Sequence, residues 1–152
     1  LLKTFATQSS LAIHNARLFR EIGDKNRFRT YRPGIEVDIT NAIINRFIFD
    51  GNLKVVSSDK ADAIVEAKLV DYRRDPLRYS EGNDVQECRL SLTLDVAVRQ
   101  TSNHKILWHH QNVTVATSYF LSGSHAQSED EAVLKLTQDA ARRVVEKTIE
   151  VW

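Results

Sequence analysis

The sequence has a single cysteine and no long apolar run. Its one cysteine, Cys88, excludes an internal disulfide, and its place among strand-forming residues predicts a small buried side chain. No apolar run approaches the roughly 20 residues that span a bilayer. The opening residues Leu1 to Thr4 do not resemble a signal peptide, so we expect any export or lipidation segment to be missing from this chain.

An excess of charge of one sign is also missing. The 21 basic and 20 acidic residues leave a formal net charge of +1. This balance gives no case for a nucleic-acid partner, which would usually require a concentrated basic face, so none is expected. Any anion-binding site must therefore be local. The 152 residues are 42% hydrophobic, which excludes a disordered chain and predicts one domain with an appendage.

The clearest helical pattern follows Pro33-Gly34, a turn from which a helix can begin. Apolar residues recur every fourth position at Ile35, Ile39, Ile43 and Phe47, and the pattern indicates an amphipathic helix. Ala42, Ile44 and Ile48 are expected to widen its apolar face. We expect the helix to end at Asp50-Gly51-Asn52 and a strand to begin at Leu53.

Alternation with a period of two predicts three longer strands. The first begins near Ala63 and is expected to end at Pro76, because proline cannot donate to a sheet ladder. The second has alternating apolar residues from Leu90 to Val98, and a turn at residues 101–104 leads into the third, from Lys105 to about Ser118. In this third strand the apolar residues change from even to odd positions, which predicts a bulge between His109 and Asn112. Trp108 is placed on the buried face.

A second helix begins with an explicit start signal, the capping box Ser128 to Glu131. Val133, Leu136, Ala140 and Val144 form one apolar stripe, and Leu134, Ala141, Val145 and Ile149 form its neighbour. This broad face is expected to lie on the sheet. Together these elements predict an α+β, two-layer fold in which two helices pack on a mostly antiparallel sheet of three strands.

Residues 1–27 are a different kind of segment. Leu2, Phe5, Ser9, Ala12, Ala16 and Phe19 follow alternating three- and four-residue steps, which predicts an amphipathic helix able to cap the domain or to self-associate. The stretches Leu2 to Gln8 and Leu11 to Ile22 resemble the exit helix of a GAF sensor domain. That resemblance implies a coiled coil leading to a signalling output. His14 stands where the family usually carries an acidic residue, so it is not interpreted as a phosphoacceptor.

A second resemblance covers most of the chain. Its motifs are, in order, Tyr31-Arg32-Pro33-Gly34-Ile35-Glu36, Thr40-Asn41-Ala42, Asp50-Gly51, Ala61-Asp62-Ala63, Asp71 to Leu77, Arg89 to Thr93, Ile106-Leu107-Trp108 and Ser128 to Ala132. From about residue 30 to 152 the chain is similar to the LptE lipopolysaccharide-assembly lipoproteins. The resemblance implies a non-catalytic component of the outer-membrane lipopolysaccharide translocon. It also implies a location at the periplasmic face and, as partners, an LptD-like β-barrel and lipopolysaccharide.

The two resemblances predict two parts, residues 1–27 and residues 28–152. The family's first strand, which precedes the Arg-Pro-Gly turn, has the GAF-like segment in its place, and a junction near residues 26–30 suggests two spliced families. Losing that strand would leave one sheet edge without a hydrogen-bonding partner. Three functions follow as hypotheses: a lipopolysaccharide-assembly subunit, a dimerising signalling fragment, and a small enzyme.

The enzyme hypothesis finds little support in the residues. His109 and His110 are adjacent on a strand and point to opposite faces, so they cannot chelate one metal together. Ser122, His125 and Asp130 include the types of a catalytic triad, but no glycine-framed nucleophile accompanies them. No phosphate loop, dinucleotide motif or paired cysteines occur. We predict no enzymatic activity, no metal and no cofactor.

One cluster suggests ligand binding. Arg73, Arg74 and Arg78 surround Pro76, and arginine forks suit phosphate oxygens such as those of lipid A. These three residues are the predicted lipopolysaccharide contacts. The alternative is a solvated strand end in which Asp71 and Asp75 neutralise the arginines. A second candidate surface comprises residues 81–84 and 122–127, which carry little positive charge.

Overall fold

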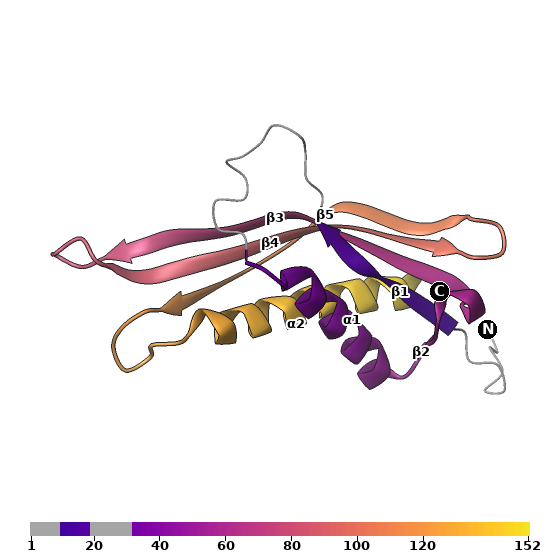
Figure 1. Ribbon diagram of the computed structural model, residues 1–152, viewed down its shortest axis with the longest axis horizontal. Coiled ribbons are helices and arrows are strands. Elements are labelled where there is room, and N and C mark those ends of the chain that lie inside the picture. The colour runs from indigo at the N-terminus through magenta and orange to yellow at the C-terminus, as the bar shows by residue number, and fades with distance from the viewer. Residues whose placement is uncertain (1–9, 19–31) are drawn as a thin grey trace.

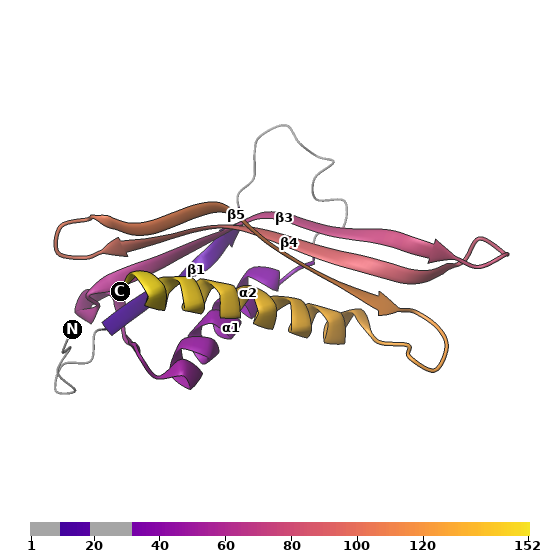
Figure 2. The same ribbon diagram turned by 180° about the vertical axis from the view of Figure 1, so that it is seen from behind.

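The computed structural model describes residues 10–18 and 32–152. Its elements are, in chain order, β1 (Ser10–Leu18), α1 (Ile35–Asp50), β2 (Lys54–Val55), a short 3₁₀ helix (Ser58–Lys60), β3 (Ala63–Tyr79), β4 (Val85–Gln100), β5 (Ile106–Phe120) and α2 (Glu129–Val151). One sheet holds all the described strands in the order β2-β1-β3-β4-β5. Figures 1 and 2 show both helices on the same side of this sheet, so the fold has two layers.

The predicted α+β, two-layer class is confirmed: α1 and α2 cover the antiparallel strands β3, β4 and β5. The sheet is larger than predicted, because β1 and β2 add two strands. β1 runs parallel to both of its neighbours, with Leu11 opposite Val55 of β2 and opposite Ala63 of β3. The edge that was expected to be open beside β3 therefore has a partner along residues 63–69.

The N-terminal helix was wrong over residues 10–18, which form β1. The predicted seam was short, and a short run of apolar residues does not separate helix from strand by periodicity. Between β2 and β3, the backbone of residues 10–18 has hydrogen-bonding partners on both sides. An isolated helix in this segment would not make these bonds between strands. The rest of the predicted helix, residues 1–9 and 19–27, lies outside the described residues.

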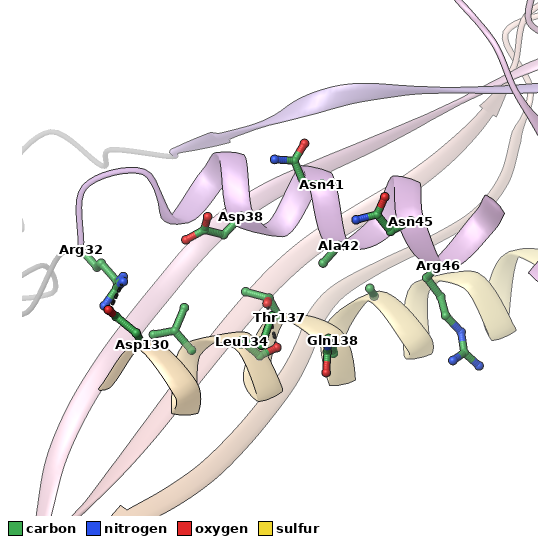
Figure 3. A pocket seen from close by; sticks show the side chains of 12 residues that line it. Arg32, Asp38, Asn41, Ala42, Asn45, Arg46, Asp130, Leu134, Thr137 and Gln138 are labelled. Atoms are coloured by element: carbon green, nitrogen blue, oxygen red, sulfur yellow. Dashed lines mark hydrogen bonds and ion pairs between the residues drawn. The ribbon is translucent and has the colours of Figure 1, made fainter. Parts of the chain in front are cut away.

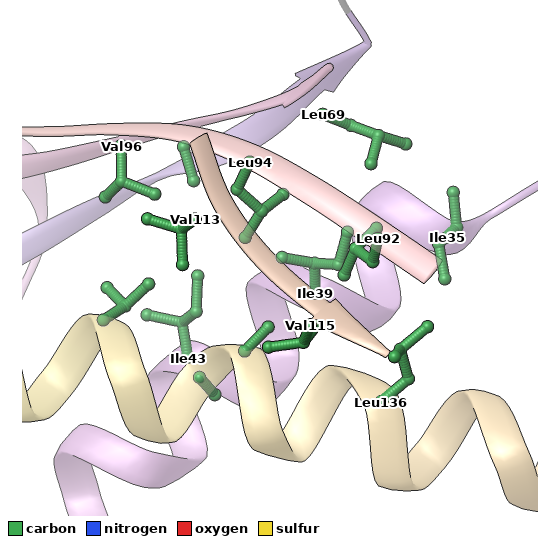
Figure 4. Packing of buried hydrophobic residues seen from close by; sticks show 14 of the residues in the cluster. Ile35, Ile39, Ile43, Leu69, Leu92, Leu94, Val96, Val113, Val115 and Leu136 are labelled. Carbon is green, nitrogen blue, oxygen red and sulfur yellow. The ribbon is translucent and has the colours of Figure 1, made fainter. Parts of the chain in front are cut away.

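The core lies between the sheet and the helices. Ile35, Ile39, Ile43 and Phe47 are fully buried along α1, as their four-residue spacing predicts. Figure 4 shows α1 side chains meeting Leu92 and Leu94 of β4 and Val113 and Val115 of β5, with Leu136 of α2 beside them. Ile48 and Leu134 were placed on the apolar faces, but each is more than half exposed.

The predicted C-terminal end of α1 and the predicted N-terminal start of α2 are both confirmed. Gly51 follows α1 in the left-handed region, with φ of 75°, and its N–H donates to the carbonyl of Phe47 at 3.0 Å. Glycine adopts this conformation without a steric penalty. At the start of α2, the Ser128 hydroxyl accepts from the Glu131 N–H, and the Glu131 carboxylate accepts from the Ser128 N–H, each at 3.1 Å.

The strand pairing confirms the bulge and corrects a strand end. Between β4 and β5, the register passes from Leu94 opposite Val113 to Val96 opposite His110, so β5 carries an extra residue there. β3 does not end at Pro76 but continues to Tyr79, with Pro76 opposite Cys88. The pairing of β1 with β3 reaches only Leu69, so Pro76 lies on an edge among the described strands, where a missing N–H is tolerated.

Trp108 is buried as predicted, with 8% of its surface exposed. Its indole N–H donates to the Thr148 hydroxyl of α2 at 3.2 Å, and that hydroxyl donates to the Val144 carbonyl at 2.7 Å. A buried indole N–H needs such a partner, because leaving it unsatisfied costs about 1–3 kcal/mol. The contact ties β5 to the last turns of α2. Cys88 is also buried, as predicted.

Candidate functional site

The predicted arginines lie where β3 and β4 extend beyond the helices. This projecting end of the sheet comprises β3 residues 73–79 and β4 residues 85–89, at the left of Figure 1. Every β3 residue from 73 to 79 is exposed. The turn at residues 80–84 and the loop before α2 lie at the same end of the sheet, as the second candidate surface requires.

The strand register separates the three arginines onto two faces. Arg73 lies opposite Ser91, whereas Arg74 lies opposite Leu90, whose side chain is fully buried on the helix side. Since successive side chains on a strand alternate, Arg73 is on the outer face and Arg74 is on the helix face. Arg78 lies opposite Glu87, the residue before buried Cys88, and is therefore also on the outer face.

Each outer-face arginine has a carboxylate nearby. Arg73 Nε is 2.8 Å from Asp71 Oδ2, and Arg78 Nε is 3.8 Å from Glu87 Oε2. The two arginine side chains are 58% and 65% exposed, so these pairs are worth at most about 1 kcal/mol each. An incoming phosphate could displace either carboxylate at little cost.

A fourth arginine, Arg89, was not among the predicted contacts. It is exposed and lies opposite Asp75, between the buried residues Cys88 and Leu90, which places it on the outer face. Arg73 and Arg89 are diagonal neighbours there, because Arg73 faces Ser91 two positions along β4. The alternating pattern of β4 predicts the face of Arg89, but only the pairing of β3 with β4 brings it beside Arg73.

Arg74 belongs instead to a tyrosine cluster under the sheet. Tyr119 is 1% exposed, and within the described residues its hydroxyl makes no hydrogen bond of ordinary geometry. Burial raises the pKa of Tyr119, and the nearby Arg74 opposes part of the rise. Burial by itself lowers the pKa of Arg74, but the neighbouring Tyr119 and Cys88 outweigh it, so the net pKa is raised.

Two further contacts near this cluster connect the sheet, and the segment before α1, to the first turn of α2. The fully buried Tyr72 donates its hydroxyl proton to Glu129 Oε1 at 3.2 Å, and Arg32, just before α1, pairs with Asp130 in the first turn of α2. Burial, followed by the Glu129 charge, raises the pKa of Tyr72, so the phenol stays protonated well above neutral pH. These contacts give Arg74 a structural setting distinct from that of Arg73 and Arg78.

Within the described residues, no hydrogen bond or ion pair joins Ser122, His125 and Asp130. Asp130 pairs with Arg32, whereas Ser122 and His125 lie in the exposed loop before α2. His109 pairs with Asp95 across the sheet at 2.7 Å. Across residues 10–18 and 32–152, no group of three or more histidine, cysteine or acidic residues is placed to hold a metal ion. In the same ranges neither helix is long and apolar enough to cross a membrane.

Three solved structures of bacterial proteins are similar to this fold at low sequence identity. A hypothetical protein from Chlamydia trachomatis matches with a TM-score of 0.59 and 13% identity, covering 93% of this chain and 96% of that one. The rare lipoprotein B from Shewanella oneidensis matches with a TM-score of 0.56, 15% identity and 95% coverage of both chains. A minor lipoprotein from Acinetobacter baumannii matches with a TM-score of 0.55, 15% identity, and 93% and 92% coverage. The architecture is thus one found in bacterial lipoproteins.

The family is shown by a family model, described as LptE, lipopolysaccharide-assembly, which matches residues 21–148. This chain belongs to the LptE family, and its role is in lipopolysaccharide assembly. A comparison with curated proteins found no match. The match begins inside the segment interpreted as a GAF exit helix, and β1 is a strand, so the GAF resemblance and its junction near residues 26–30 are not supported.

Proposed function

We propose that this protein is a non-catalytic subunit of an outer-membrane lipopolysaccharide translocon, which assists the assembly of an LptD-like β-barrel and binds lipopolysaccharide for delivery to the surface. The family match over residues 21–148 carries the proposal. The likeness of the fold to lipoproteins from two other bacteria supports placement as a lipoprotein at the periplasmic face of the outer membrane. No cofactor is proposed.

The test of this function is co-purification with the barrel. A tagged copy of the protein, expressed in its own host, should recover the LptD-like barrel in a fixed ratio, and depletion should leave the barrel misassembled and lipopolysaccharide absent from the surface. A matched tagged periplasmic protein controls for capture by the tag. Normal barrel assembly and normal surface lipopolysaccharide after depletion would contradict the proposal.

Within this function, the outer face of the projecting end is proposed to bind the lipopolysaccharide phosphates. Arg73 and Arg78 offer exposed guanidinium groups with weakly held partners, and these forks suit phosphate oxygens. Arg74, the third predicted contact, lies near Tyr119 on the helix face, and it is included as a further contact because it is exposed at the same end of the sheet. The loop at residues 122–127 and the turn at residues 81–84 flank this surface.

The phosphate site is tested by alanine variants and salt. Binding of purified lipopolysaccharide should weaken as salt rises, because exposed charges are screened over about 8 Å at physiological ionic strength. Arg73→Ala combined with Arg78→Ala should weaken binding at low salt, and adding Arg74→Ala should weaken it further. A control with the same loss of charge on α2, Lys135→Ala with Arg142→Ala and Lys147→Ala, should bind as the parent does. Equal binding by the arginine variants would place the phosphate contacts elsewhere.

A further inference from the structure

A groove of about 550 Å³ runs between α1 and α2. Its lining comes from the two helices and from Arg32, just before α1. Figure 3 shows the Arg32–Asp130 pair at one end of the groove and the Arg46 side chain at the other. Ala42, Val133 and Ala141 contribute small apolar surfaces, and the exposed Leu134 lies among them.

The polar groups of the groove have unused hydrogen-bonding capacity. Within the described residues, the amides of Asn41, Asn45 and Gln138 make no side-chain hydrogen bond, and Asp38 has no ion-pair partner. Arg46 has no carboxylate partner there either, and its Nε is buried without a hydrogen bond. Its guanidinium lies 5.4 Å from the centre of the Phe49 ring. Asp38, Asn41, Asn45 and Gln138 are exposed, so their polar groups are open to a ligand, and of these groove groups only Arg46 Nε is buried without a described partner.

The spacing of the amides fits an extended polypeptide. Asn41 and Asn45 are four residues apart, which is about 6 Å along a helix. An extended chain repeats every two residues at about 6.6 Å, so alternate peptide groups can lie opposite the two amides. Each side-chain amide has both donors and an acceptor, and it can therefore bond the N–H and the carbonyl of a peptide group.

Two opposite charges on α1 define a second spacing along the groove. Asp38 and Arg46 are eight residues apart on α1, which is about 12 Å along the helix and corresponds to three or four extended residues. Among the described residues, no aromatic ring lines the groove. Since saccharide sites commonly stack a sugar against such a ring, the lining favours a polypeptide over a glycan.

We propose that the α1–α2 groove binds an extended segment of a partner protein, in which a basic residue beside Asp38 and an acidic residue beside Arg46 are three or four positions apart. Asn41, Asn45 and Gln138 hydrogen-bond the backbone of the segment between them. The lining includes none of Arg73, Arg74 and Arg78, so the groove can be tested with peptides in the absence of lipopolysaccharide.

The test uses capped nine-residue peptides of threonine and valine that carry one lysine and one glutamate at separations of one to seven positions. Fluorescence anisotropy with the whole protein should give the tightest binding at a separation of three or four. N-methylation of the peptide groups between the two charges should weaken that binding about tenfold or more, because it removes backbone donors. Equal binding at all separations, or no binding, would overturn the proposal.

Variants locate the site. Asn41→Leu and Asn45→Leu should each weaken binding of the best peptide about tenfold, and Arg46→Gln should abolish the preference for glutamate. Lys135→Leu adds the same side chain at an exposed position of α2 outside the groove and should leave binding unchanged. Urea unfolding checks that each variant is folded. Binding of maltohexaose in place of the peptides, lost on Asn45→Leu, would show a saccharide site and overturn the proposal.

Discussion

Both halves of β3 pair with β4, and the first half also pairs with β1, but the two halves differ in burial. From Ala63 to Leu69, every second residue is buried beneath the helices, whereas all residues from 73 to 79 are exposed. The ladder with β4 continues through both halves. Backbone pairing therefore does not determine burial, which depends on whether a helix lies against that part of the sheet.

This difference separates stability from binding. In the covered half, apolar area is removed from water at about 25 cal/mol per Å², which makes it the main stabilising region. In the projecting end, charged side chains form weak exposed pairs, and substitutions there usually change stability by no more than about 0.5 kcal/mol. Residues in the second half can change their partners without unfolding the first.

The largest effect is expected from deleting residues 1–18. This deletion removes β1 from between β2 and β3 and leaves the β3 backbone unpaired along residues 63–69. We expect a loss of at least about 3 kcal/mol, comparable with a core truncation, in urea unfolding followed by circular dichroism. An unchanged midpoint would support the predicted division into residues 1–27 and 28–152.

Truncation of Trp108 tests the covered half directly. Trp108→Ala should lower the free energy of unfolding by about 3–5 kcal/mol, because it leaves a cavity and removes the hydrogen bond from the indole N–H to the Thr148 hydroxyl. Trp108→Phe should cost less, since it keeps most of the apolar surface. In a Trp152→Phe background, the Trp108 fluorescence of the folded parent should be blue-shifted. A spectrum like that of tryptophan in water would contradict its burial.

Tyr72 lies at the boundary between the two halves of β3. Its raised pKa predicts that the stability of the protein depends on pH in the alkaline range. The folded protein holds the phenol proton more tightly than the unfolded chain, because burial and Glu129 raise the pKa of Tyr72. As the pH rises above about 10, the unfolded state loses this proton first, so stability falls by up to about 1.4 kcal/mol per pH unit. Tyr72→Phe should make the fall between pH 9 and 11 shallower in urea midpoints. An identical slope in the variant would show that Tyr72 does not cause it.

A smaller effect is expected at the start of α2. Ser128→Ala removes the acceptor for the Glu131 N–H and should lower stability by about 1 kcal/mol in thermal or urea unfolding. Ser128→Asp should retain most of the parent's stability, because a carboxylate can accept the same bond. Equal destabilisation by both substitutions would point to a role of the hydroxyl other than capping.

The smallest effect belongs to the projecting end. Arg73→Ala should change the free energy of unfolding by no more than about 0.5 kcal/mol, since the side chain is exposed and its pair with Asp71 is weak. Lys135→Ala, at an exposed position of α2, provides the comparison. A loss above about 1 kcal/mol would mean that this end is part of the stabilising region and would break the distinction between the halves.

The sequence by itself determined the elements whose patterns are long and locally complete. The four-residue spacing from Ile35 to Phe47, the alternation from Leu90 to Val98 and the capping box at Ser128 each predict an observed element, because their signals depend on neighbours along the chain. The change of parity in β5 also predicted the bulge. The collinear motifs from residue 30 onward identified the family that the comparison shows.

Tertiary structure decided what depends on distant partners. β1 is a strand because β2 and β3 offer it backbone bonds from both sides, and no pattern within residues 10–18 states this. β3 passes Pro76 because β4 continues to pair with it while its other edge carries no described strand there. The three arginines, close in sequence, lie on two faces because strand side chains alternate and the register shifts between Pro76 and Arg78. Arg89 joins Arg73 only through the register of β3 with β4.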